Sequence, residues 1–410
     1  MSEGRVASGE GRGVEGRGVD ENAPAARGAP PEEQYATAAG ADRDLTSSPG
    51  IRSASRPSSL VPRPWSLALS LLPPLVALVI ALVAGDLLIL SFGQAPADVY
   101  RLMLEGTWGN AYGFGQVLYK ATTLVFTGLA VALALRAGLF NIGAEGQLAA
   151  GGFAAALSGL LLPAGTPAIL AIPLCVLAAA AGGAAVGAVP GVLKARFGAH
   201  EVIVTIMLNF IVLALLNWVV AAKLHVPEML HTPPMRAGPV PRLSAFVPAF
   251  HGSAVNVTIL LAAAAVALFH WYLFRTRRGY ELRAVGLQPE AAEYGGVSVA
   301  TVWLRTLALA GAIAGLGGVN FVLGYKQYYE EGFAGGAGFL GIAVALVGRN
   351  HPLGVVLAAL FFATLSQGGL AINALVPKQM VEVLQGIVIL TVAMTVPEVR
   401  RLLSQQRVRR

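Results

Sequence analysis

The polar residues best suited to chemistry lie in a glycine-rich stretch, 138–147, within a long apolar region. Asn141, Glu145 and Gln147 place an amide, a carboxylate and a second amide between two short apolar runs. Each glycine costs about 1 kcal/mol relative to alanine in a helix interior, so the stretch favours a helix break. Polar groups at membrane depth are tolerated only where they face protein or a water-filled cavity. The sequence therefore predicts a broken helix that lines a path through the protein.

A second set of polar residues lies in the apolar run 202–222. Thr205, Asn209 and Asn217 follow one another at spacings of four and eight, which puts them close to one face of a helix. Such a face fits two interpretations equally. It is either a seam of hydrogen bonds between helices or part of the lining of the path.

The most charged segment between apolar runs is the loop 275–299. Residues 280–286 have the pattern of a short amphipathic turn, and Pro289 is placed for the first position of a helix through 290–294. A short helix with alanines on one side and charges on the other suits docking into a groove of a soluble partner. The alternative is an ordinary solvated loop with an excess of positive charge.

The composition indicates an all-α polytopic membrane protein. Of the 410 residues, 55% are hydrophobic and only 12% are charged, and the mean hydropathy is +0.66. Soluble globular chains carry roughly 25% charged residues. The net charge of +7 comes mainly from basic residues in loops and at the C-terminus. We interpret it as setting the orientation in the membrane, with membrane lipid and no nucleic acid as a partner.

Apolar stretches close to 20 residues recur from Trp65 onward and predict about ten transmembrane helices. Glycine-rich polar stretches at 138–147 and 332–338 indicate two related halves with broken or re-entrant segments. With an even number of spans, both termini share a side, and the positions of Lys and Arg assign it to the cytoplasm. The organisation expected is a disordered cytoplasmic tail (1–64), a transmembrane domain (65–397) and a basic cytoplasmic tail (398–410).

Metal and nucleotide chemistry is not expected in this chain. Cys175 is the only cysteine, and the six histidines show no spacing typical of metal ligands. The pattern G-x-x-x-x-G-K-[ST], which cradles phosphates, does not occur. We therefore expect no cofactor in this chain, and any ATP has to be used by a partner subunit.

Four stretches together resemble one family: 138–152, 201–209, 283–296 and 341–354. They are spaced as in the permease subunits of bacterial ABC importers of the branched-chain amino acid/simple sugar group, and within it look closest to the nucleoside permeases. The resemblance covers roughly residues 65–397. It implies a multi-pass protein of the bacterial cytoplasmic membrane.

The resemblance also implies partners. These are cytoplasmic ABC ATPase subunits, a second and related permease, and an extracytoplasmic substrate-binding lipoprotein. The contact with the ATPase is expected on the 283–296 segment, at Arg283, Gly286, Pro289, Ala291, Ala292, Tyr294 and Gly295.

The function expected is translocation of a nucleoside or simple-sugar-like solute. The residues expected along the path are Asn141, Glu145, Gln147, Thr205 and Asn209. Amides suit hydroxyl groups and base edges, whereas Glu145 suits a structural role at the N-terminus of a half-helix. The alternative is a secondary transporter driven by an ion gradient, with Glu145 as the coupling carboxylate. An intramembrane enzyme would need convergent His, Asp or Glu residues within the spans, so no enzymatic activity is expected.

Overall fold

The computed structural model describes residues 79–80 and 82–391. Contacts divide the chain into two units, Met1–Val61 and Pro62–Arg410, and all described residues belong to the second. The tail expected at 1–64, most of the span expected at 65–90 and the tail expected at 398–410 lie outside the described residues.

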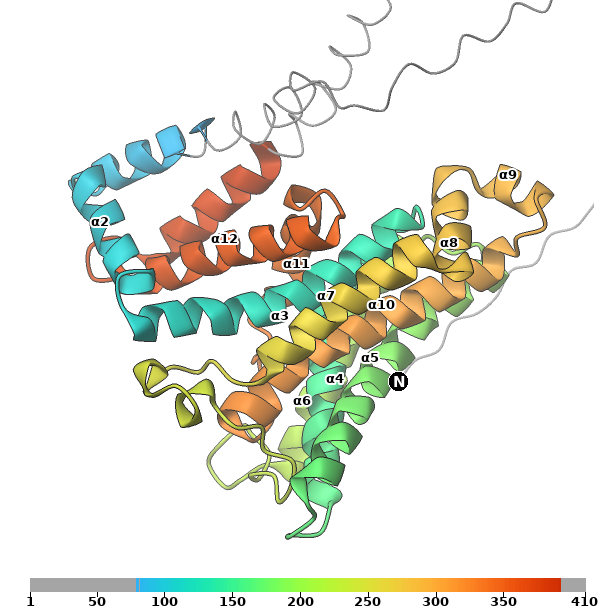
Figure 1. Cartoon of the computed structure of the whole chain (residues 1–410), viewed down its shortest axis with the longest axis horizontal. Coiled ribbons are helices and arrows are strands. Elements are labelled where there is room, and N and C mark those ends of the chain that lie inside the picture. Colours follow the sequence, from blue (N-terminus) through green and yellow to red (C-terminus); the bar gives the residue numbers. More distant parts are fainter. Residues whose placement is uncertain (1–78, 81, 392–410) are drawn as a thin grey trace, which may run out of the picture. The chain divides into compact units, whose positions relative to one another are not determined.

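The described part of the chain is a bundle of helices joined by turns and one long loop, 225–257 (Figure 1). In chain order the α-helices with given bounds are α2 (Pro96–Thr107), α3 (Ala111–Arg136), α4 (Ala144–Leu161), α5 (Ala168–Phe197), α6 (Glu201–Val219), α7 (Thr258–Arg275), α8 (Arg277–Leu287), α9 (Pro289–Tyr294), α10 (Val299–Phe321), α11 (Ala337–Val347) and α12 (Pro352–Ala371). Residues 82–91 and 378–391 are helical as well. One π-helical turn, Val220–Leu224, extends α6, and another, Val322–Lys326, extends α10.

Six helices of the described part are long and apolar enough to cross a membrane: α3, α5, α6 with its π turn, α7, α10 with its π turn, and α12. A seventh span results if Leu82–Ser91 and α2, which meet at 109°, count as one. The 11 residues of α11 extend only about 17 Å at 1.5 Å per residue. A bilayer core is about 30 Å thick, so α11 alone does not cross it. The chain is thus a multi-pass helical protein, and the count of ten stays a prediction.

Helices α3 and α10 form the centre of the bundle. In their most apolar windows 78% and 67% of residues are buried, against 22% in α5, in α6 and in α7. The apolar core includes Phe126, Leu129 and Leu133 of α3 with Leu307 of α10. The side chains of α3 and α10 are therefore fixed by packing. The outer helices α5, α6 and α7 expose apolar surface suited to lipid.

Glycines let α5 lie directly against α10. A Cβ on Gly183 would meet the carbonyl oxygen of Gly311, and one on Gly187 would meet that of Leu307. In lipid, where apolar side chains gain nothing by leaving the solvent, small residues of this kind let helix backbones approach and pack. The Ala- and Gly-rich sequence of α5 thus lets it pack directly against α10.

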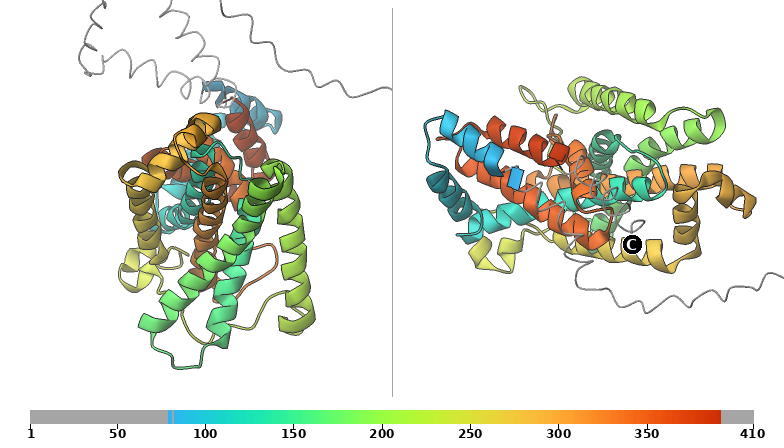
Figure 2. Two further views of the ribbon diagram at one scale, coloured as in Figure 1. Left: turned by 90° about the vertical axis from the view of Figure 1, so that its right-hand side faces the viewer. Right: turned by 90° about the horizontal axis from the view of Figure 1, so that it is seen from above.

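The two ends of the bundle differ. At one end α8 and α9 project beyond α7 and α10 (Figure 2). At the opposite end the 225–257 loop is tied to the end of α10, since Val240 N–H donates to Leu323 O (2.9 Å) and Thr232 N–H donates to Tyr329 O (2.8 Å). We refer to these as the α8–α9 end and the loop end.

Candidate functional site

Two half-helices meet N-terminus to N-terminus beside α3. The Glu145 carboxylate, in the first turn of α4, accepts hydrogen bonds from the backbone N–H groups of Gly336 (2.8 Å) and Gly338 (2.6 Å), at the start of α11. Only 5% of Glu145 is exposed. The positive ends of both helix dipoles stabilise its negative charge. The predicted structural role of Glu145 corresponds to this geometry, with α11 as the half-helix that it caps.

This junction lies well inside the bundle. The Thr127 hydroxyl of α3 donates to Ala337 O (3.0 Å), and Thr127 is nine residues before the last residue of α3, Arg136. That separation corresponds to about 14 Å along the helix axis. Both half-helices therefore begin inside the bundle, and Glu145 satisfies two of the N–H groups that the start of α11 leaves without a partner in the helix.

Glycine is required where the two chains touch. A Cβ on Gly338 would collide with the backbone N and Cα of Glu145, and Gly336 has a φ of +83°. Positive φ is common only for glycine. The glycine-rich stretches at 138–147 and 332–338, which the sequence treats as counterparts, thus lie in contact with each other.

The non-helical chain before α4 is held by the other predicted polar residues. Asn141 Nδ2 donates to Gln147 Oε1 (2.9 Å), and Gln147 Nε2 donates back to Asn141 Oδ1 (3.2 Å). Asn209 Nδ2 donates to Ile142 O (2.8 Å), while its Oδ1 accepts from Gly146 N–H (2.9 Å). The Asn209 contacts replace backbone hydrogen bonds that a continuous helix would make, while the Asn141–Gln147 pair joins the non-helical chain to the first turn of α4.

The structure brings together all five residues predicted for the path, with α6 supplying two of them. Thr205 Oγ1 accepts a hydrogen bond from Ile142 N–H (3.3 Å). Each of the five is buried, and none lines the large cavity described next. Asn217 is not part of this cluster, because its Nδ2 donates to Glu331 Oε1 (2.8 Å) towards the loop end.

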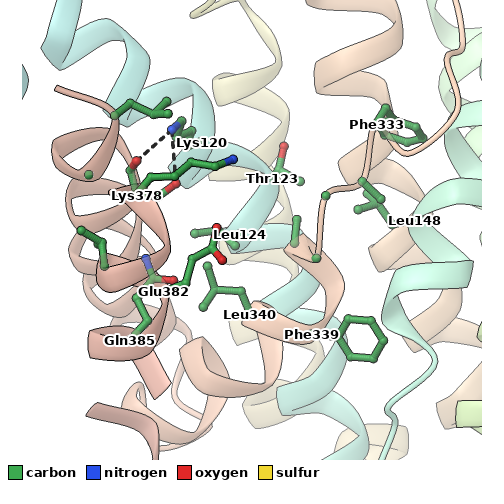
Figure 3. Close-up of a pocket in the computed structure, with 18 of the residues that line it drawn as sticks. Lys120, Thr123, Leu124, Leu148, Phe333, Phe339, Leu340, Lys378, Glu382 and Gln385 are labelled. Carbon is green, nitrogen blue, oxygen red and sulfur yellow. Dashed lines mark hydrogen bonds between the residues drawn. The ribbon is translucent and has the colours of Figure 1, made fainter. Parts of the chain in front are cut away.

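A cavity of about 670 Å³ lies between α3, the 334–340 segment, α12 and the helix 378–391 (Figure 3). Its polar lining includes Lys120, Thr123, Ser366, Lys378, Glu382 and Gln385, and its aromatic lining consists of Tyr119, Phe321, Phe333 and Phe339. Gly336 and Leu148 also line it, so the junction of α4 and α11 forms one wall of the cavity.

Lys120 and Gln385, two polar residues of the cavity, differ in the hydrogen bonds that they make. Lys120 Nζ donates to Ser366 O and to Ser366 Oγ, both at 3.2 Å. Gln385 is 8% exposed, and within the described residues its side-chain amide makes no recorded hydrogen bond. Gln385 lines the cavity, so its amide can hydrogen-bond a polar ligand that enters there.

Sequence reasoning missed these cavity residues. A signal for Lys120 was present, because it is the one full charge within α3 before its last residue, Arg136, and a charge inside a span points to a functional site. No comparable signal identifies Gln385 among the polar residues that follow α12.

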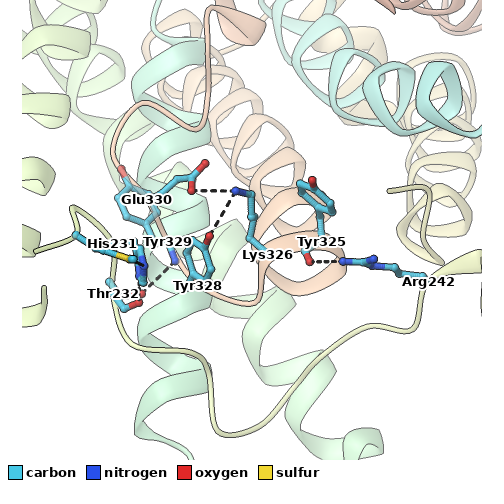
Figure 4. Close-up of polar contacts among 9 residues, drawn as sticks. His231, Thr232, Arg242, Tyr325, Lys326, Tyr328, Tyr329 and Glu330 are labelled. Atoms are coloured by element: carbon cyan, nitrogen blue, oxygen red, sulfur yellow. Dashed lines mark hydrogen bonds and ion pairs between the residues drawn. The ribbon is translucent and has the colours of Figure 1, made fainter. Parts of the chain in front are cut away.

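A polar and aromatic cluster closes the loop end (Figure 4). The His231 ring stacks on Tyr328 with centroids 4.2 Å apart, and Lys326 forms an ion pair with Glu330 (3.3 Å). Arg242 donates to Tyr325 O (3.1 Å). These contacts bind the 225–257 loop to the segment that leads into α11.

The residues predicted for partner contact form the α8–α9 end. Tyr294 is 98% exposed and Leu287 85% exposed, whereas Ala292 is buried. A Cβ on Gly286 would collide with the carbonyl oxygen of Arg136, so α8 rests directly on the end of α3. Pro289 is the first residue of α9, and Ala291 and Gly295 are exposed beside Tyr294.

Residues 113–393 match the family described as the permease component of the branched-chain amino acid transport system. The chain belongs to this permease family. It is 38% identical to the guanosine ABC transporter permease protein NupP of Bacillus subtilis, over 79% of this chain and 93% of NupP. It is 34% identical to the nucleoside ABC transporter permease protein NupB of Lactococcus lactis, over 78% of this chain and 90% of NupB.

A third relative differs in its named solute. The glucose ABC transporter permease protein TsgB13 of Haloferax volcanii is 36% identical, over 77% of this chain and 85% of TsgB13. No solved structure matches the chain.

Proposed function

We propose that the chain is the membrane-spanning permease subunit of an ABC importer for a nucleoside or simple-sugar-like solute. The observation that supports this most directly is the meeting of α4 and α11 at Glu145 beside a polar and aromatic cavity, in a chain of this permease family. Broken helices that meet inside a membrane protein are typical of solute sites in transporters.

The distribution of charge supports the predicted orientation. Arg275, Arg277, Arg278 and Arg283 lie at the α8–α9 end, as do Lys194 and Arg196 near the C-terminus of α5. By the positive-inside rule this end is cytoplasmic and the loop end is external. With about ten spans in two related halves, both termini are cytoplasmic as well.

The cavity supports an entry route from the external side. Lys120 and Ser366 lie towards the loop-end halves of α3 and α12. The junction of α4 and α11 lies deeper and closes the floor. We assign Asn141, Glu145, Gln147, Thr205 and Asn209 to the packing behind this floor, where they hold the half-helices together until the bundle rearranges.

The cavity lining also supports the class of solute. Aromatic faces suit a base or a sugar ring, and Lys120, Gln385 and Thr123 suit hydroxyl groups. Guanosine, nucleosides and glucose, the solutes in the names of the relatives, share many hydroxyl groups. A nucleoside uses both kinds of contact.

Energy enters at the α8–α9 end. We propose that Leu287 and Tyr294, which expose apolar surface there, dock into a separate cytoplasmic ATPase that binds the ATP. A second permease and an extracytoplasmic binding lipoprotein complete the importer. In the alternative, an ion-gradient-driven transporter, Glu145 would exchange an ion, but both of its oxygens already accept hydrogen bonds from α11.

Reconstitution tests the proposal. Proteoliposomes that contain this permease, its partner permease and the ATPases, supplied with the binding lipoprotein, should accumulate labelled guanosine only with ATP. An ATPase variant that cannot hydrolyse ATP is the control. Accumulation by this chain alone, driven by a proton or sodium gradient without ATP, would establish the secondary transporter instead.

A further inference from the structure

A second recess lies at the α8–α9 end, remote from the solute cavity. It has a volume of about 550 Å³ and is lined by the last residue of α3, Arg136, and by the turn between α11 and α12. The lining residues of this turn are Gly348, Arg349, Asn350 and His351, and Gly354 in the first turn of α12 lines the recess as well.

Positive charge accumulates around this recess. The Arg136 and Arg283 guanidinium carbons lie 6.0 and 5.4 Å from the centre of the same ring, that of Phe274. Within the described residues no ion pair is recorded for Arg136, Arg283 or Arg349. Partial burial and the nearby charges of Arg136 and His270 hold the pKa of His351 below its usual range. Arg136 and Arg283 share one ring and Arg349 lines the recess with Arg136, so these arginine charges raise one another's energy, and an anion would reduce that repulsion.

The turn itself is strained and incompletely bonded. Arg349 and Asn350 have consecutive positive φ values, 55° and 53°, in a region that residues other than glycine seldom adopt. Asn350 O accepts from Arg136 Nε (3.0 Å), but Asn350 Oδ1 is inaccessible to water and has no hydrogen-bond partner. Asn350 lines the recess, and the N–H₂ group of an amide can donate to an anion.

We propose that this recess binds a phosphate group, supplied by the headgroup of an anionic phospholipid. Guanidinium groups match phosphate oxygens in pairs. The recess lies where α3 ends and α12 begins, at the ends of two helices that are long and apolar enough to cross a membrane. Basic pockets between transmembrane helices on the cytoplasmic side are typical sites for such headgroups. Free inorganic phosphate is the other source of the same chemistry.

The site is also linked to α8. The backbone of Gly286 packs on the carbonyl of Arg136, so a headgroup that fixes Arg136 also fixes the base of the α8–α9 pair. This consequence for coupling rests on the proposed function, whereas the binding itself does not.

The test measures lipid retention by the purified full-length permease. Native mass spectrometry would compare bound phosphatidylglycerol and bound phosphatidylcholine after exchange into mixtures of known ratio. We expect phosphatidylglycerol to be enriched, and Arg349→Gln to lower the enrichment about fivefold, since each basic side chain near an anionic surface contributes about a factor of five. Arg196→Gln, an exposed residue at the same end but outside the recess, is the matched control for loss of one positive charge and should lower the enrichment less than Arg349→Gln does.

Two further arms separate the sources and guard against misfolding. Arg136→Lys retains the charge but loses the paired geometry, and it should retain less phosphatidylglycerol at unchanged thermal stability. Inorganic phosphate at millimolar concentration should not displace the lipid; if it does so and binds equally well, the lipid assignment is overturned. Equal enrichment in wild type and Arg349→Gln, or protection of the recess only by the ATPase, would overturn the phosphate site itself.

Discussion

Replacement of Glu145 by Gln tests whether one carboxylate joins the two half-helices. The amide keeps one oxygen, which can still accept from one of the two N–H groups at the start of α11. The other N–H group then faces an N–H₂ group and loses its acceptor. A hydrogen bond to a charged group contributes about 1.5–3 kcal/mol, and an unsatisfied buried donor costs about 1–3 kcal/mol more. The junction should therefore weaken by about 2.5–6 kcal/mol.

Hydrogen exchange at residues 336–340 measures this loss locally. A loss of 3 kcal/mol corresponds to exchange more than about a hundredfold faster at the first amides of α11. The amides of α3 should keep their protection. Glu330→Gln, which removes a part-exposed ion pair with Lys326, should cost less than about 1 kcal/mol and is the matched control. Unchanged exchange at 336–340 in a folded Glu145→Gln protein would refute the role of the carboxylate as the joint.

Three other predictions follow from packing, exposure and the cavity. Gly183→Ala should lower the melting temperature, because its Cβ collides with a carbonyl of α10 at a cost of about 1–3 kcal/mol, whereas Gly386→Ala, which meets nothing within 4 Å, should not. Tyr294→Ala should leave thermal stability unchanged, since the side chain is 98% exposed, yet weaken pull-down of the ATPase about thirtyfold. Gln385→Ala should weaken guanosine uptake about two- to tenfold through one lost hydrogen bond, with exposed Gln379→Ala on the same helix unaffected.

Each of these three predictions has a result that would contradict it. Equal melting of the two glycine variants would mean that α5 and α10 are not in backbone contact. Full ATPase pull-down by the Tyr294 variant would place the contact elsewhere. Equal loss of uptake in both glutamine variants would indicate a general effect on the helix rather than a contact with the solute.

The sequence predicted the helix break and the structural acid because both depend on local chemistry. Three glycines and polar residues in an apolar context predict the break at 138–147, whatever part of the chain packs against it. The partner of Glu145 could not be predicted in the same way, because Gly336 and Gly338 are more than 190 residues away. Only packing of α11 against Thr127 decides which backbone reaches the carboxylate.

Other features depend on which way a side chain points along its helix, on where a helix begins and on how helices pack. Thr205 and Asn209 share a face as predicted, yet Asn217 extends to a different partner near the loop end. The start of α3 at Ala111 depends on a local cap, since Asn110 Oδ1 accepts a hydrogen bond from Gly113 N–H (2.6 Å). The cavity residues depend on how the helix 378–391 packs, which periodicity alone does not determine.

Helix α3 touches every part of the proposed transport cycle. It lines the solute cavity with Lys120, supports the start of α11 with Thr127 and bears on α8 at Arg136. These three contacts span 16 residues, or about 24 Å of one uninterrupted helix. A rod of this kind moves as a whole, so a push at the α8–α9 end would reach the cavity without any intermediate joint. The rate of the cycle would then depend on the contacts that neighbouring segments make at their glycines, and not on bending of α3.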